Sequence, residues 1–306
     1  MSVPSPTRRL ALMNQKGGVG KTTTAVNLAA AVARRGRPTL IVDLDPQAHA
    51  TLHMGVNADD ARLTIYDLLL DPDADPAQAV TEVRPNLGVI ASETDLAAAE
   101  PELVSRPNRH GRLDRVLSRL ESRFEFIFID CPPSLGLLTM NGLVAAREVI
   151  IPMQAHFLAL QGLGKLLETI SMVRAQLNPR LRVAGVVLCM HDAQATHTRE
   201  VVGDMEAFFA EARDVPDSAW RYARVFRPAI RRNIKLAESP SFGQTIFDYA
   251  PGAPGASDYD ELASTLLSDW DRMLERREMS GSAGAFADRL EVHVTPTTAP
   301  REGLRP

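Results

Sequence analysis

The sequence has few cysteines and no long apolar run. Its two cysteines, Cys131 and Cys189, are too few for a disulfide framework and lack the C-x-x-C spacing of a zinc site. No apolar run is long enough to cross a membrane, and the opening residues MSVPSPTRRL contain no apolar stretch of signal-peptide length. These absences argue against a disulfide-stapled secreted domain and a membrane-spanning helix, so we expect a soluble protein in a reducing cytoplasm.

Lysine is also scarce, because only four of the 34 basic residues are lysines. Two of the four, Lys16 and Lys21, lie in one short glycine-rich stretch. Lysine carries a compact charge on a flexible stem, whereas arginine presents a planar fork, so we expect a specific task for this pair. The formal net charge of -4 argues against a protein that coats nucleic acid with its whole surface, but it leaves room for a local basic face.

Short apolar runs alternate with longer amphipathic stretches along the chain. The runs predict strands at 10–13, 39–42, 87–90, 124–129, 149–151 and 183–190, and helical spacing is clearest at 22–35 and 160–177. Strands that are apolar on both faces and alternate with helices are typical of a parallel sheet. The sequence therefore predicts an α/β fold with a mostly parallel central sheet flanked by helices on both faces.

We expect one domain over residues 8–276, preceded by a flexible N-terminus at 1–7. The last helix is predicted at about 257–276. The segment that follows, 277–306, is rich in small residues and proline and has no sustained periodicity. Such a composition is typical of a disordered tail.

The glycine-rich stretch NQKGGVGKTTT stands between the first predicted strand and the first predicted helix. It departs from the phosphate-binding pattern G-x-x-x-x-G-K-[ST], because Gln15 occupies the position of the first glycine and Lys16 follows it. In such a loop the backbone N–H groups and the start of the helix bind phosphate oxygens, the lysine reaches the β- and γ-phosphates, and the next threonine binds Mg²⁺. We predict a phosphoryl-binding P-loop for ATP formed by Gly17, Gly18, Val19, Gly20, Lys21, Thr22 and Thr23.

Carboxylates follow two predicted strands at the edge where this loop lies. Asp130 ends the run FIFID and matches the Walker-B position that holds Mg²⁺, usually through a water. Asp43 and Asp45 follow another run in VDLDPQ, where one could position the attacking water and the other support the metal. An Asx-turn before Pro46 is the alternative role for this pair.

Three ordered motifs, KGGVGKTTT, VDLDPQ and IDCPPSLGLLTMN, resemble those of the ParA/Soj partition ATPases. These belong to the deviant Walker A group of P-loop NTPases, which also includes MinD and the nitrogenase iron protein. The resemblance covers about residues 8–270. It implies slow hydrolysis of ATP with Mg²⁺ in a homodimer that sandwiches two nucleotides, with Lys16 crossing to the partner's phosphates. It assigns Asp45 to water activation and Asp43 to the switch region near Mg²⁺.

The resemblance also implies partners and a location. An ATP-dependent homodimer would bind double-stranded DNA nonspecifically, associate with the nucleoid in the cytoplasm, and leave DNA when a ParB-like adaptor stimulates hydrolysis. Its cargo would be a chromosome origin, a plasmid or a protein cluster. The segment WRYARVFRPAIRRNIKLAESPSFGQTI resembles a region that contributes to DNA binding in this family. Phosphate contacts need only cations, and the candidates are Arg231, Arg232 and Lys235, although charge runs are often merely solvated faces.

Some positions depart from the family pattern. Gln194 stands where Soj-like chains have an arginine associated with DNA, and Lys235 replaces another arginine. His156 and Gln161 stand where the family has two glutamates. A lone histidine is more often packed or solvated than a metal ligand, so we assign no function to His156. These changes bear on the cargo and the strength of DNA binding and leave the ATP site unchanged.

Other members of the group define the alternatives. A MinD-like membrane-associated ATPase would end in a basic amphipathic helix, but Phe286, Leu290 and Val292 have little positive charge near them, so membrane binding is not expected. An iron–sulfur protein would use paired cysteines, but Cys131 lies in the DCPPS context of partition ATPases and Cys189 ends a predicted buried strand, so no cluster is expected. A metabolic P-loop transferase, such as a small-molecule kinase or an amidating synthetase, is the third alternative.

Overall fold

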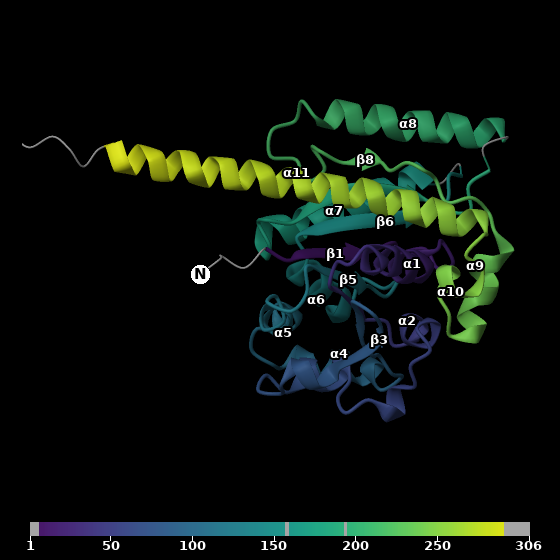
Figure 1. Cartoon of the computed structure of the whole chain (residues 1–306), viewed down its shortest axis with the longest axis vertical. Helices are drawn as coiled ribbons and strands as arrows, with labels where there is room; N and C mark the ends of the chain where they lie inside the picture. Colours follow the sequence, from purple (N-terminus) through teal and green to yellow (C-terminus); the bar gives the residue numbers. More distant parts are fainter. Residues whose placement is uncertain (1–5, 157–158, 193–194, 291–306) are drawn as a thin grey trace, which may run out of the picture. The chain divides into compact units, whose positions relative to one another are not determined.

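The computed structural model describes residues 6–156, 159–192 and 195–290. Within them an eight-stranded sheet runs in the order β3-β4-β2-β5-β1-β6-β7-β8 (Figure 1). All neighbouring strands are parallel except the antiparallel pair β3 and β4. The predicted α/β class and mostly parallel sheet are therefore confirmed. The strands are β1 (Arg8–Leu12), β2 (Thr39–Asp43), β3 (Val80–Arg84), β4 (Leu87–Ile90), β5 (Phe126–Asp130), β6 (Glu148–Met153), β7 (Arg182–Leu188) and β8 (Arg224–Val225).

Helices connect the strands in the manner of parallel α/β proteins. The α-helices are α1 (Lys21–Arg34), α2 (His49–His53), α3 (Ile65–Leu70), α4 (Leu96–Val104), α5 (Arg112–Ser118), α6 (Leu137–Ala145), α7 (Ala159–Gln176), α8 (Thr196–Ala212), α9 (Ile234–Glu238), α10 (Ile246–Tyr249) and α11 (Pro254–Leu290). Short 3₁₀ turns lie at η1 (Ala58–Asp60), η2 (Pro76–Ala79) and η3 (Ser239–Phe242).

Alternate residues of the central strands face two apolar layers. Ala11 of β1, Val42 of β2 and Ile129 of β5 belong to one large core cluster with residues of α3 to α8. The opposite face of the same strands is covered by α1, which packs against β1, β2 and β5 (Figure 1). Strands enclosed on both sides must be apolar on both sides, which explains the continuous apolar runs of the sequence.

Each predicted strand is confirmed to within two residues at either end. The structure adds β3 and β8, which were not predicted. β8 has two residues, too few to produce a period-two pattern, and β3 is an edge strand whose residues are only partly buried. Edge strands are often short and carry charged residues, as β3 does, so their apolar signal is weak.

The last helix is longer than predicted. α11 begins at Pro254 and continues to Leu290 instead of ending near residue 276. Proline suits the first helical position, and residues 277–290 contain no proline and include several strong helix formers. The predicted end of this helix near residue 276 is therefore wrong, because the helix ends at Leu290. Residues 291–306 of the predicted tail and residues 1–5 of the predicted flexible N-terminus lie outside the described residues. The division into a domain at 8–276 and a tail stays a prediction.

The chain divides into two compact units, Met1–Ser264 and Thr265–Pro306. The first contains the whole sheet and every predicted site residue. No described helix combines the length and the apolar character needed to cross a membrane.

Candidate active site

The glycine-rich loop joins the carboxyl end of β1 to the start of α1. Gly18 and Gly20 have φ angles of 70° and 92°, in the left-handed region that favours glycine. A Cβ on Gly17 or Gly18 would meet no atom within 4 Å, whereas one on Gly20 would lie 3.2 Å from Sγ of Cys189. One part of the loop therefore faces open space while its end packs against the residue that follows β7.

Lys21 begins α1 and is 7% exposed. Its Nζ donates a hydrogen bond to the carbonyl of Lys16 at 3.4 Å, across the loop. The start of α1 carries the positive end of the helix dipole, and its first turn contains no acidic residue to neutralise it. Glycine N–H groups, a helix start and an ammonium together form an arrangement that can bind a phosphate chain.

Two carboxylates lie side by side at the same edge of the sheet. In the register of β2 and β5, Asp43 is paired with Asp130. Asp43 is buried, and its Oδ2 accepts hydrogen bonds from the N–H and the hydroxyl of Thr51, both at 2.8 Å. Asp130 is 1% exposed, and neither of its oxygens has a hydrogen-bond partner among the described residues. A buried carboxylate without a partner is costly unless a cation or its waters complete the site.

Burial raises the pKa of both carboxyl groups. The pKa of Asp130 rises to about 8, first through burial and then through the charge of Asp43, while Thr22 and Lys21 lower it by less. The pKa of Asp43 rises to about 6 through burial, and the hydrogen bonds from Thr51 oppose that rise. Ionised Asp130 is therefore poorly stabilised by the protein alone. Its oxygens and the Thr22 hydroxyl are hard donors that suit Mg²⁺.

Asp45 follows β2 and is half-buried. Its Oδ1 accepts a hydrogen bond from the N–H of Gln47 at 3.0 Å, which is an Asx-turn, and its carbonyl accepts one from the Ser92 hydroxyl at 2.7 Å. The alternative role predicted for this residue is thus present in the structure. The turn fixes the backbone and uses only Oδ1, so Oδ2 can still orient a water.

Lys16 is exposed, and its side chain extends to another segment of the same chain. Its Nζ lies 2.9 Å from Nε2 of His156, just after β6. The sequence did not predict this contact, because we assigned no function to His156. The available signal was the replacement of a family glutamate by histidine at that position.

The predicted DNA-binding residues lie around α9. Arg231 forms an ion pair with Asp258 at 2.7 Å, and Lys235 forms one with Glu238 at 2.8 Å. Arg232 is exposed, and its side chain has no partner among the residues that the structure describes. Gln194 lies outside the described residues. The neighbouring turn η3 packs against α2, which follows Asp45 in the chain.

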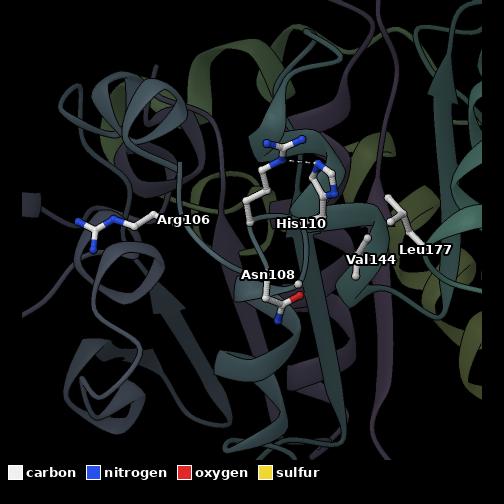
Figure 2. Close-up of a pocket in the computed structure, with 7 residues that line it drawn as sticks. Arg106, Asn108, His110, Val144 and Leu177 are labelled. Atoms are coloured by element: carbon white, nitrogen blue, oxygen red, sulfur yellow. Dashed lines mark hydrogen bonds between the residues drawn. The ribbon is translucent and has the colours of Figure 1, made fainter. Parts of the chain in front are cut away.

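A separate hollow of about 370 Å³ lies at the opposite end of the helices, between the 106–111 loop and the last residues of α6 and α7 (Figure 2). Figure 2 shows Arg106 directed away from His110, with Val144 and Leu177 on the other side. No predicted site residue lines this hollow. It therefore takes no part in the candidate site.

Comparison with known proteins agrees with this geometry. The AAA domain family matches residues 7–183. The chain is 41% identical to the sporulation initiation inhibitor protein Soj of Bacillus subtilis, over 85% of this chain and 98% of that protein. It is 42% identical to the chromosome partitioning protein ParA of Myxococcus xanthus, over 85% of this chain and 88% of that protein.

Solved structures with the same fold include nucleotide complexes. Cobyrinic acid a,c-diamide synthase of Mycobacterium smegmatis, with bound ATP analogue and magnesium, gives a TM-score of 0.71 at 37% identity, covering 87% of this chain and 96% of that one. The cell division ATPase MinD of Pyrococcus furiosus gives a TM-score of 0.66 at 24% identity, covering 85% of this chain and 98% of that one. The second likeness concerns the fold alone.

Proposed function

Because the chain belongs to the ParA/Soj family of partitioning ATPases, we propose that it is an ATP-driven positioning protein. Two protomers close around two ATP molecules with Mg²⁺, bind DNA without sequence preference, and separate after hydrolysis. The cargo is a chromosome origin, a plasmid or a protein cluster, and the names of the relatives favour the chromosome. This role implies that the protein acts in the cytoplasm, bound to nucleoid DNA.

The observation that carries this proposal is the unpartnered carboxylate of Asp130. It is 1% exposed and lies at the edge where the glycine-rich loop and Lys21 meet. In the proposed complex Asp130 and Thr22 hold Mg²⁺, Asp130 through a water, and Lys21 neutralises the phosphate chain. Gly17 to Gly20 and Thr23 supply backbone donors, and Asp43 orders the segment after β2 through Thr51. Bound magnesium supplies the charge that stabilises the phosphoryl group during transfer.

Lys16 and Asp45 complete the proposed chemistry. Asp45 orients the attacking water with the oxygen that its Asx-turn leaves free. Lys16 is exposed and makes no hydrogen bond to Asp43, Asp45 or Asp130 in its own chain. This supports a role toward the phosphates of the second protomer, where it adds positive charge as an arginine finger does.

The proposed DNA surface contains Arg231, Arg232 and Lys235. Ion pairing partly neutralises Arg231 and Lys235, because each already has an acidic partner. Arg232 can give its whole charge to a phosphate. The contact between α2 and η3 joins this segment to the region after Asp45, which supports control of DNA binding by the nucleotide.

A ParB-like adaptor is proposed as the partner that stimulates hydrolysis, and this part rests on family membership. The MinD-like alternative stays open for the C-terminal residues. Deleting residues 279–306 tests this alternative. If the deletion abolishes binding to anionic liposomes, a membrane role is favoured; if it leaves liposome binding unchanged, the MinD-like alternative is excluded.

One observation favours a second candidate function. The likeness to cobyrinic acid a,c-diamide synthase at 37% identity supports a metabolic synthetase as the second candidate. Phosphate release that requires an added carboxylate acceptor, and ignores DNA and adaptor, would favour that function.

Binding to random-sequence duplex DNA tests the proposal. The protein is measured with ATP, with ADP and without nucleotide, each across a series of salt concentrations. We expect binding only with ATP and a steep fall of affinity with salt, because phosphate contacts release counterions. Equal binding in all three states, or none in any, would contradict the proposal.

A further inference from the structure

Three contacts fasten the glycine-rich loop to the end of β6. The Lys16 ammonium lies 2.9 Å from Nε2 of His156. Asn14 Nδ2 donates to the carbonyl of Pro152 at 2.8 Å, and Gln154 Nε2 donates to the carbonyl of Gly18 at 3.4 Å. The last two contacts are between groups that do not titrate. The first joins two groups that do, and one of them is the lysine proposed to act across the dimer.

The Lys16–His156 contact requires one protonation state of histidine. A lysine ammonium has three donors and no acceptor. The imidazole must therefore accept through Nε2 and carry its proton on Nδ1, which is the neutral form. A protonated imidazolium has no acceptor left and repels the ammonium.

The small cavity beside this pair has no other charged residue in its described wall. Lys16 and His156 line a small cavity of about 50 Å³ between the loop, the end of β6 and the start of α7. Among the described residues that line it, these two are the only titratable ones. Asn14 and Gln154 are polar and uncharged, and the rest are glycine or apolar side chains. No acidic group of the cavity wall therefore offsets a charge gained by His156.

We propose that His156 is a positioning residue that keeps Lys16 within its own protomer, and that dimerisation around nucleotide must break this contact. The inference rests on the proposed action of Lys16 in trans. Protonation of His156 releases Lys16 and so favours the dimer. Losing one exposed hydrogen bond changes an equilibrium about 3- to 10-fold. A symmetric dimer breaks two such contacts, so the dimer dissociation constant should change about 10- to 100-fold.

The test measures the dimer dissociation constant by analytical ultracentrifugation of the full chain, with Mg²⁺ and a non-hydrolysable ATP analogue. The pH is varied from about 8 to about 5.5, where histidine takes up a proton. The wild-type dimer should tighten as the pH falls. Asp43 and Asp130 also titrate in this range, so the readout is the difference between wild type and variants in which position 156 does not titrate.

Three substitutions separate the contact from the charge. His156→Gln keeps an acceptor that does not titrate, so its dimer should stay as weak as wild type at about pH 8 and lose the histidine part of the pH profile. His156→Ala removes the acceptor and should give a tighter dimer at high pH. His156→Glu replaces it with a carboxylate and should weaken the dimer across the range. Equal dissociation constants for wild type and His156→Ala at high pH, or equal pH profiles for wild type and His156→Gln, would overturn the inference.

A second measurement tests the contact without nucleotide. The ring ¹⁵N shifts of His156, which report its tautomer, are recorded by NMR at about pH 8 for wild type and for Lys16→Ala. Wild type should carry the proton on Nδ1, because Nε2 accepts from Lys16, and the variant should lose this preference; equal shifts in the two proteins would overturn the contact itself. A wild-type protein that stays monomeric with the ATP analogue, while its tautomer depends on Lys16, would instead contradict the proposed function.

Discussion

Replacing Asp130 by asparagine should stabilise the ligand-free protein and remove its response to Mg²⁺ and ATP. Burial raises the pKa of this carboxyl to about 8, and its oxygens have no partner among the described residues. The unfolded chain gives up this proton near its ordinary pKa of about 3.9, so the carboxyl destabilises the fold increasingly as the pH rises between these two values. At about pH 7.5 the upper limit of this cost is about 5 kcal/mol.

The expected gain is smaller than that limit. Part of the cost belongs to Asp43, because it is buried beside Asp130 and the two carboxylates repel each other. In addition, an asparagine amide that lacks a partner costs about 1–2 kcal/mol. We therefore expect Asp130→Asn to raise the free energy of unfolding by about 1–3 kcal/mol at about pH 7.5. At about pH 5.5 the cost of ionising Asp130 falls by more than half while the cost of the amide stays, so the gain should fall to about zero.

Urea unfolding in EDTA at these two pH values measures the effect, and thermal unfolding with Mg²⁺ and ATP measures the loss of ligand stabilisation. Asp45→Asn is the matched control, because an asparagine keeps the Asx-turn and should change stability by less than about 0.5 kcal/mol. If Asp130→Asn lowers stability at both pH values, or if the nucleotide stabilises it as much as wild type, Asp130 is not an uncompensated metal ligand.

Further outcomes are expected for the glycine-rich loop, for His53 and for the proposed DNA surface. Gly20→Ala should lower the free energy of unfolding in urea by about 1–3 kcal/mol, because φ is 92° and the new Cβ would lie 3.2 Å from a neighbouring side chain. Gly17→Ala is the control and should lower it by less, because a Cβ there meets nothing within 4 Å. Burial lowers the pKa of His53 to about 4, so its contribution to stability falls as the pH drops from about 6.5 toward 4, opposite to that of Asp130. His53→Gln should therefore be more stable relative to wild type at about pH 4.5 than at about pH 7, and an equal difference at the two pH values would refute it. Arg232→Gln should weaken ATP-dependent DNA binding about 3- to 10-fold at low salt and reduce the salt slope. Arg231→Gln should weaken DNA binding less but destabilise the fold, since buried Asp258 loses its ion-pair partner and keeps the N–H of residue 231, and the reverse ranking would contradict the assignment.

The strands and the loop could be predicted because their signals are local. A parallel strand enclosed on both faces is an unbroken apolar run, as at Leu87–Ile90, where prediction and structure coincide. The glycine pattern likewise reports backbone angles within a few residues. The end of α11 was harder, since small residues and glycine weaken a helical pattern without stopping the helix.

The contacts that decide the chemistry depend on residues far apart in sequence. Asp43 and Asp130 both end apolar strands and look alike in the sequence, yet Thr51 satisfies only Asp43. Lys16 and His156 are separated by 140 positions, so no periodicity could pair them. The same holds for Arg231, whose acidic partner lies 27 residues along the chain and reduces the charge available for the proposed DNA contact.

The action of Lys16 in trans is the central claim, and mixing two inactive variants tests it most directly. Lys16→Ala keeps its own Asp45 but cannot supply the crossing lysine, whereas Asp45→Ala supplies that lysine but cannot activate water. In a mixed dimer, the site of the Lys16→Ala protomer regains both groups.

ATP hydrolysis is measured for each variant alone and for an equimolar mixture, with DNA and adaptor present. We expect the mixture to recover up to about a quarter of wild-type turnover, because half the dimers are mixed and each has one complete site. A mixture no faster than the mean of the two variants would contradict the claim, and would mean that Lys16 serves the nucleotide of its own chain.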